Sequence, residues 1–196
     1  MTDAPEGADA AAVARNAVNG VTIDGKFLAV DGRRFLVKGI AYGTFAPDAG
    51  PDRAQFPSPA RIAQDFGLMA AAGFNTVRTY TVPPMDLLDE AAQHGLRVMV
   101  GIPWAQHIAF LDDLPLVRQI RQEAVAAVRR LASHPAALMF AVGNEIPPAI
   151  VRWHGHRRIE RFLRELYEDI KGAAPESLLT YVNFPPTEFL DLSFFD

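Results

Sequence analysis

A carboxamide and a carboxylic acid stand side by side where an apolar run ends, at Asn144 and Glu145. The run before them, residues 137–142, has the continuous apolar character of a strand that is buried on both faces. Two prolines follow and stop further strand pairing, because proline cannot donate a ladder hydrogen bond. Glu145 is therefore expected at the mouth of an apolar core, a setting in which a carboxylic acid becomes a proton donor near neutral pH. Taken alone, the same residues fit an ordinary helix-N-terminal acid equally well.

Other residues that end predicted strands could face the same site. Arg78 lies on a core strand, where an arginine is seldom buried without a partner carboxylate, so a site arginine and a structural ion pair are both open. Trp104 could offer an apolar ring face to a sugar, although ordinary loop packing explains it nearly as well. Tyr42, Tyr80 and Asn183 are expected to form walls rather than reacting groups.

No metal or cofactor is expected. His154 and His156 form a His-x-His pair, but no acid or cysteine ligand stands at useful spacing, so we interpret them as solvated loop histidines. The chain has no cysteine, which excludes disulfides, thiolate nucleophiles and Cys-ligated zinc. The first strand-to-helix turn also lacks a Gly-rich phosphate-binding fingerprint.

The elements that must position these residues alternate along the chain. Two Asp-Gly pairs, 24–25 and 31–32, separate short apolar runs and predict an N-terminal β-hairpin. The expected core strands are 35–42, 74–80, 96–102, 137–142 and 178–183. Four helices are expected: one that begins at Ser58-Pro59, one over 84–94, one that follows Asp113 and one over 156–171. Proline or glycine marks several of their ends.

Strands that alternate with helices indicate right-handed βαβ units and a parallel sheet. The links that follow two strands are long, at 43–57 and 103–113, whereas the links that precede strands are short. In a (β/α)8 barrel the loops after the strands build the site, and a complete barrel usually takes about 250 residues. We therefore predict an α/β fold of TIM-barrel type, truncated after about five βα units, over residues 21–196. Residues 1–20 are expected to be a disordered lead-in.

The composition limits which partners and which cellular location are expected. The 196 residues are 49% hydrophobic with a net charge of −4, which fits one globular domain and gives no electrostatic reason for nucleic acid or an anionic membrane as partner. No apolar stretch approaches the roughly 20 residues that span a bilayer. The first twenty residues lack the basic start and apolar core of a signal peptide, so a cytoplasmic location is expected.

Four segments taken together resemble a known family. Residues 35–42, 73–80, 95–100 and 142–145 are similar, in order, to the first four strands of clan A glycoside hydrolases. The similarity is greatest to the barrel domain of family two, which includes β-galactosidases, β-glucuronidases and β-mannosidases. The resemblance implies hydrolysis of β-glycosidic bonds by a retaining mechanism. It further implies that Glu145 is the general acid/base, that Asn144 contacts the sugar 2-hydroxyl and that Arg78 helps to position the nucleophile.

The family's nucleophile is a second glutamate at the end of the seventh strand, and it is expected outside this chain. The chain alone should therefore be a poor glycosidase, with a β-linked oligosaccharide or glycoside as ligand. Glu145 and Arg78 are expected to face one shared cavity. The open edges of a truncated sheet are expected to cause self-association, or to make the chain depend on a missing C-terminal part. The alternative is a non-catalytic carbohydrate-binding or scaffolding module of a larger glucan-processing or glycosyltransferase-fused protein. The sequence identifies neither the sugar nor the linkage.

Overall fold

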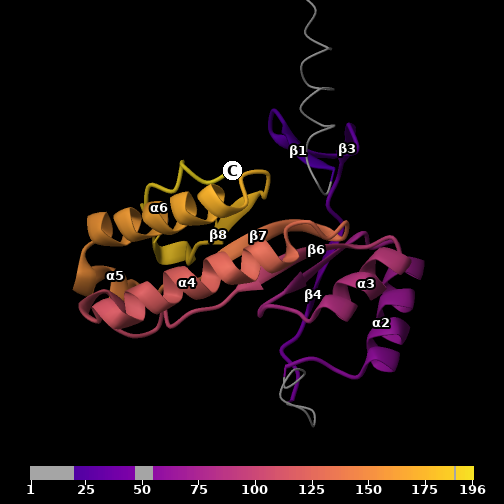
Figure 1. The fold of residues 1–196 in the computed structure, drawn as a ribbon, viewed down its shortest axis with the longest axis horizontal. Helices are drawn as coiled ribbons and strands as arrows, with labels where there is room; N and C mark the ends of the chain where they lie inside the picture. Colours follow the sequence, from indigo (N-terminus) through magenta and orange to yellow (C-terminus); the bar gives the residue numbers. More distant parts are fainter. Residues whose placement is uncertain (1–19, 47–54, 188) are drawn as a thin grey trace, which may run out of the picture.

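The computed structural model describes residues 20–46, 55–187 and 189–196 (Figure 1). The predicted lead-in, residues 1–20, lies outside the described residues except for Gly20. The described chain forms a three-stranded antiparallel sheet and a five-stranded sheet in the order β4-β5-β6-β7-β8, in which all neighbours are parallel. This α/β arrangement of successive parallel strands confirms the predicted fold class.

The N-terminal sheet is a meander of three strands rather than a single hairpin. It consists of β1 (Val21–Asp24), β2 (Phe27–Val30) and β3 (Arg33–Phe35). Asp31 and Gly32 between β2 and β3 both have positive φ, 52° and 72°, as a tight two-residue hairpin turn requires. Because Arg33–Phe35 pair with β2, the first strand of the large sheet begins at Gly39 and not at residue 35 as predicted.

The meander packs against the end of the large sheet at which its strands begin. Val21 is buried against Leu138, near the start of β7, and against Leu178, just before β8. An ion pair between Asp31 and Arg97, the first residue of β6, joins the same two parts at 3.7 Å. The opposite end of the sheet, where the strands finish, is therefore the end that the meander leaves uncovered.

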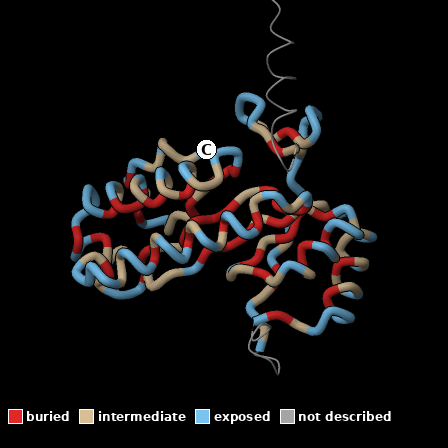
Figure 2. The backbone as a smooth tube through the Cα atoms, in the orientation of Figure 1, coloured by how far each residue is buried: buried red, intermediate tan, exposed pale blue. Residues whose placement is uncertain are grey.

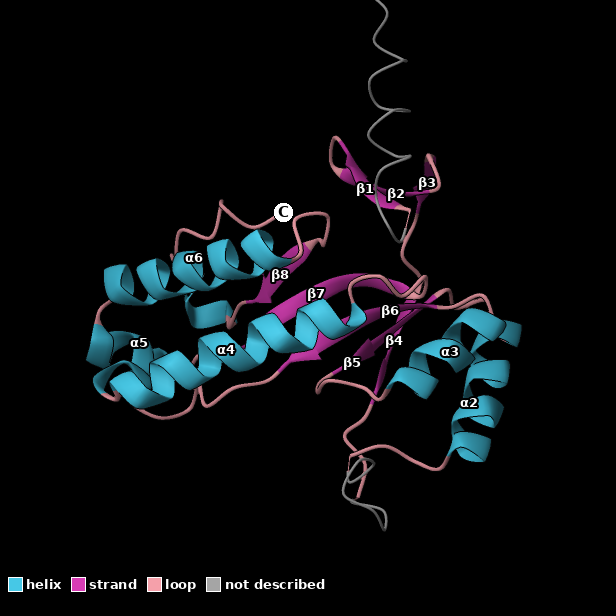
Figure 3. Ribbon diagram, viewed as in Figure 1, coloured by secondary structure: helices cyan, strands magenta, loops and turns pink. Residues whose placement is uncertain are grey.

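The large sheet is covered by helices on one face (Figure 3). Its strands are β4 (Gly39–Tyr42), β5 (Thr76–Thr79), β6 (Arg97–Ile102), β7 (Ala137–Asn144) and β8 (Leu179–Val182). The helices are α2 (Pro59–Ala71), α3 (Met85–Gln93), α4 (Leu114–Leu131), α5 (Pro148–His154) and α6 (His156–Ala173), with short 3₁₀ turns η1 (Phe110–Asp112) and η2 (Pro185–Thr187). None of the described helices is long and apolar enough to cross a membrane.

The core lies between the sheet and these helices, where Figure 2 shows the buried residues concentrated. Side chains alternate along each strand, so Val77, Val98 and Phe140 are fully buried against the helices. The half-buried Arg78 and Met99 share the other face. That second face, together with the finishing ends of the strands, is where the candidate site lies.

Candidate functional site

Arg78 and Asn144 meet across the sheet although their strands, β5 and β7, are separated by β6. The Arg78 Nη2 atom donates a hydrogen bond to the Asn144 Oδ1 atom at 2.6 Å. Gly101 lies on β6, where it is paired with Ala141 of β7, and a Cβ there would come within 2.5 Å of the Thr79 carbonyl oxygen. The partner of Arg78 is thus a carboxamide rather than the carboxylate of a structural ion pair.

The backbone around Glu145 is tied to two neighbouring segments, the loop after β6 and the strand β8. The Asn144 carbonyl accepts a hydrogen bond from Gln106 Nε2 at 2.6 Å, and the Glu145 N–H donates to the Val182 carbonyl at 2.8 Å. Glu145 has φ +56°, a left-handed conformation that costs a non-glycine residue about 1–3 kcal/mol. Such a conformation persists only where the surroundings hold it, and it is typical of functional positions.

Tyr181 of β8 completes this set of contacts. Its hydroxyl accepts a hydrogen bond from the Ile146 N–H at 2.8 Å. Burial raises the pKa of Tyr181 to about 12, and the negative charge of Glu145 contributes to the rise. The Tyr181 hydroxyl is therefore neutral at physiological pH and keeps its own proton.

A cavity of about 150 Å³ opens at the ends of β5, β6 and β7. It is lined by Arg78, Thr79, Tyr80, Gly101, Ile102, Pro103, Gln106, Ala141, Gly143 and Asn144. Two buried polar atoms of this lining, Arg78 Nε and Gln106 Oε1, have no hydrogen-bond partner among the described residues. Both atoms are shielded from solvent, so they are a donor and an acceptor without partners beside the cavity. Glu145 is not among the residues that line this cavity, although Asn144 directly before it is.

Tyr80 and Trp104 take different places relative to this cavity. Tyr80 lines it, with the Arg78 guanidinium carbon 5.0 Å from the centre of its ring. Trp104 packs edge-on against Phe110 and Phe162, with centroid distances of 4.9 and 5.5 Å. Trp104 is half-buried and packs in this aromatic cluster, with its ring beside Gly143 of the cavity lining.

Tyr42 and Asn183 are directed elsewhere. In the register of β4 and β5, Tyr42 is paired with the buried Thr79, so it faces the helices and donates from its hydroxyl to Asp65 of α2 at 3.0 Å. Burial and the Asp65 carboxylate raise the pKa of Tyr42 well above its ordinary value. Asn183 exchanges hydrogen bonds with Thr187, both at 2.9 Å, and so closes its own turn. Neither residue lines the cavity.

His154 corrects the interpretation of the His-x-His pair. It is buried rather than solvated, its ring lies 5.4 Å from that of Phe110, and its Nε2 atom accepts a weak hydrogen bond from the Leu111 N–H at 3.4 Å. Burial lowers the pKa of His154 below its ordinary value. His156 is exposed, and the described residues contain no cluster of His, Asp and Glu suited to hold a metal ion.

Sequence reasoning missed Gln106 and Tyr181. Gln106 sits in a loop, and nothing local shows that its carboxamide turns inward to bind the Asn144 carbonyl. Tyr181 lies in a predicted strand, but only the pairing of β7 with β8 brings its hydroxyl to Ile146. The strand assignment was the one signal that could have pointed to Tyr181.

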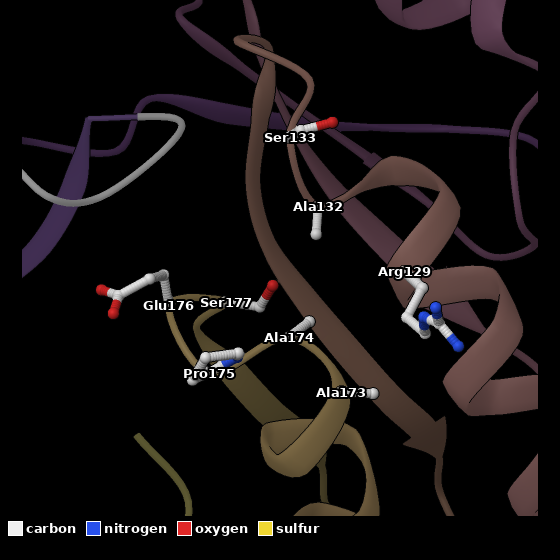
Figure 4. Close-up of a pocket in the computed structure, with 8 residues that line it drawn as sticks. All are labelled: Arg129, Ala132, Ser133, Ala173, Ala174, Pro175, Glu176 and Ser177. Atoms are coloured by element: carbon white, nitrogen blue, oxygen red, sulfur yellow. The ribbon is translucent and has the colours of Figure 1, made fainter.

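A larger cavity of about 280 Å³ lies at the other end of the sheet, between the end of α4 and the loop after α6 (Figure 4). Its lining is mainly small residues, with Arg129 and Glu176 as the only charged side chains. Figure 4 shows the Glu176 side chain extending away from Arg129. Because this cavity has no convergent polar groups and lies on the meander side, the smaller cavity beside Asn144 is the better candidate site.

Comparisons with known proteins identify the family of the chain and a shared fold. The family model described as "Glycosyl hydrolases family 2, TIM barrel domain" matches residues 21–193. The β-glucuronidase of Parabacteroides merdae is similar in structure with a TM-score of 0.65 and 18% identity over 81% of this chain. A Bifidobacterium dentium β-glucuronidase complexed with coumarin-3-O-glucuronide gives a TM-score of 0.68 with 16% identity over 88% of this chain. No curated protein sequence matches.

The chain spans only part of the length of these structures. It covers 20% of the Parabacteroides merdae protein and 27% of the Bifidobacterium dentium protein. A Ruminococcus gnavus β-glucuronidase in complex with D-glucuronic acid is covered to 26%, with a TM-score of 0.66 and 15% identity over 82% of this chain. At these identities the likeness shows a common fold.

Proposed function

Because this chain belongs to glycosyl hydrolase family 2, as its TIM barrel domain, we propose that it serves the hydrolysis of β-glycosidic bonds with Glu145 as general acid/base. The observation that carries the proposal is the arrangement around Glu145. Its left-handed backbone is held by bonds from β8, directly after an Asn144 side chain that Arg78 orients. Such pre-organisation of one dipeptide by several strands is what a catalytic geometry needs.

The roles proposed for the neighbours follow from their free atoms. Arg78 occupies the Asn144 Oδ1 atom, which directs the Asn144 amide NH₂ as a donor for a sugar hydroxyl. The residues Arg78 and Gln106, each with one unpaired buried polar atom, line the same cavity. A β-linked glycoside or oligosaccharide, which is rich in hydroxyl groups, suits this lining.

A retaining mechanism needs a second carboxyl group about 5–5.5 Å from the first, which attacks the anomeric carbon. The residues that line the described cavity include no carboxylate. In this proposal the described part of the chain supplies Glu145, and the nucleophile comes from elsewhere in the protein.

The experiment compares the complete gene product with its Glu145→Gln variant on two kinds of β-glycoside, one with an alkyl and one with a 2,4-dinitrophenyl leaving group. Loss of the acid should lower turnover of alkyl-like glycosides about 10²–10⁴-fold, because their leaving groups need a proton. Turnover of 2,4-dinitrophenyl glycosides should fall much less at the glycosylation step, because that leaving group departs without one. Equal losses on both kinds of substrate would remove Glu145 from the acid role.

The alternative function is a non-catalytic carbohydrate-binding or scaffolding module, and the absence of a carboxylate from the cavity lining favours it. A module predicts no turnover by the complete gene product and binding that Asn144→Ala abolishes while Glu145→Gln preserves it. Self-association is a further proposal. It is supported by β4 and β8, each of which pairs on only one side in the described sheet.

A further inference from the structure

The side chain of Gln106 is directed at the backbone beside Glu145. Gln106 is 6% exposed, and its Nε2 atom donates a hydrogen bond to the Asn144 carbonyl at 2.6 Å. A carbonyl oxygen only accepts hydrogen bonds, so this contact requires the amide nitrogen rather than the amide oxygen. The Nε2 atom also lies 3.5 Å from Nε2 of the exposed His107, a much longer contact. The Asn144 carbonyl is therefore the principal partner of Gln106.

The loop that carries Gln106 is itself held in place. The Gln106 N–H donates to the Trp104 carbonyl at 2.8 Å. The Trp104 ring packs against Phe110, and it lies within 2.9 Å of the position that a Cβ on Gly143 would take. The loop after β6 thus contacts two consecutive residues of β7, Gly143 through the ring of Trp104 and Asn144 through the amide of Gln106.

The peptide group that joins Asn144 to Glu145 is held at both of its polar atoms. Gln106 donates to its oxygen, and its N–H donates to the Val182 carbonyl of β8 at 2.8 Å. Glu145 has φ +56°, which residues with a side chain seldom adopt. A rotation of this peptide by about 180° would bring φ of Glu145 to about −120°, in the broadly allowed β region. The two hydrogen bonds therefore oppose a rotation that the backbone of Glu145 itself favours.

The rotation would displace the segment that carries Glu145. It would turn the Asn144 carbonyl away from Gln106 and toward the Val182 carbonyl, and two carbonyl oxygens repel each other. The segment would then have to move away from β8. A misplacement of about 1 Å is enough to lower the rate of a positioned catalytic group about 10²-fold.

The second polar atom of the Gln106 side chain shows what the residue does not contribute. Its Oε1 atom is buried and has no hydrogen-bond partner among the described residues. A buried acceptor without a partner costs free energy, so an apolar side chain of the same length would avoid this penalty. The donor that Gln106 supplies to the Asn144 carbonyl explains a glutamine here, and the neutral amide supplies it without adding charge beside the proposed acid.

We propose that Gln106 is a positioning residue for Glu145, holding the peptide between Asn144 and Glu145 in the orientation that general acid catalysis needs. Gln106 acts on the reaction only through this peptide. The inference rests on the proposed function, because it assigns Gln106 a role in placing the acid that the proposed function names.

Gln106→Met in the complete gene product tests the proposal, because methionine has a similar length and no donor. The probes are the methyl and 2,4-dinitrophenyl β-glycosides of whichever sugar the wild type hydrolyses best among glucose, galactose, mannose and glucuronic acid. The measurement is kcat/KM, which reports the glycosylation step. We expect a loss of about 10–100-fold on the methyl glycoside, whose leaving group needs a proton, and of less than about threefold on the dinitrophenyl glycoside.

The ratio of the two losses separates positioning from a general structural effect. Both rates come from one protein sample, so a lower folded fraction reduces them equally and leaves their ratio unchanged. Gln106→Glu provides a second variant of the same length, in which a carboxylate cannot donate to the Asn144 carbonyl, and its ratio should be at least as large. Gln119→Met is the matched control, since Gln119 is exposed on α4 and donates to Glu123, and it should change neither rate.

Glu145→Gln on the same two substrates separates this proposal from the proposed function. A loss confined to the methyl glycoside in Glu145→Gln, together with equal losses on both substrates in the two Gln106 variants, would overturn the positioning role alone. Unchanged rates in those variants would overturn it as well. Equal losses in Glu145→Gln, or no turnover by the wild type, would overturn the proposed acid and with it the role of Gln106.

Discussion

The Tyr181 hydroxyl accepts a hydrogen bond from the backbone N–H of Ile146 at 2.8 Å, which ties β8 to the residue that follows Glu145. Ile146 is completely buried, so this N–H has no access to solvent. The Glu145 N–H is bound to β8 as well, through the Val182 carbonyl. The conformation of the proposed acid is therefore decided by a strand that lies some 35 residues further along the chain.

Tyr181→Phe should destabilise the protein by about 1–3 kcal/mol, because it leaves the buried Ile146 N–H without an acceptor. Urea unfolding followed by circular dichroism measures the change. Tyr167→Phe is the matched control, since it removes a hydroxyl whose acceptor, Asp196, keeps other donors. A loss no larger than that of the control would show that the Tyr181 hydroxyl does not hold the Glu145 loop.

Gly143→Ala should destabilise the protein more than an alanine at another positive-φ glycine. Gly143 has φ +106°, and an added Cβ would lie 2.9 Å from the Trp104 ring, which is itself packed against Phe110 and Phe162. Backbone strain and overpacking together should cost about 2–4 kcal/mol.

Gly25→Ala separates the two effects, because Gly25 also has positive φ but has no atom within 4 Å of the added Cβ. Thermal unfolding of both variants gives the comparison. Similar losses in the two proteins would mean that the contact with Trp104 is not what requires glycine at position 143.

His154 should make stability depend on pH below neutrality. Burial lowers its pKa in the folded state, opposed by Asp112 at 3.7 Å and aided by Arg158. The unfolded chain, with an ordinary histidine pKa of about 6.5, then binds more protons than the folded chain as the pH falls past that value. The free energy of unfolding should therefore decrease from about pH 7 toward pH 5.

His154→Gln should flatten this part of the profile of unfolding free energy against pH, and the exposed His156→Gln should leave it unchanged. Urea unfolding at half-unit pH steps provides the profile. A wild-type stability that rises on acidification over the same range would show that the folded state stabilises the imidazolium instead.

The sequence alone determined the order and type of most elements and the placement of Asn144 and Glu145 at a strand end. These features follow from local signals, since apolar runs, proline and glycine act on the backbone within a few residues. The predicted start of α6 at His156 and the end of β7 beside Glu145 agree with the structure for that reason. The same local signals gave a wrong prediction at residues 35–38, which connect the two sheets instead of beginning a core strand. They also missed the helix α5, which begins at Pro148.

Only the tertiary structure decided which side chains meet. From the sequence, Arg78 could either pair with a carboxylate or belong to the site. In the structure its partner is the side-chain amide of Asn144, 66 residues away. Tyr42 faces the helices because the strand register pairs it with the buried Thr79. A register shifted by one residue would place its side chain on the other face of the sheet. Gln106 and Tyr181 bind the backbone around Glu145 through contacts between distant segments, which no local pattern of residues encodes. The strand ends that form the candidate site were thus readable from the chain, whereas the contacts that orient its side chains come from the packing of β5, β7 and β8 in one sheet.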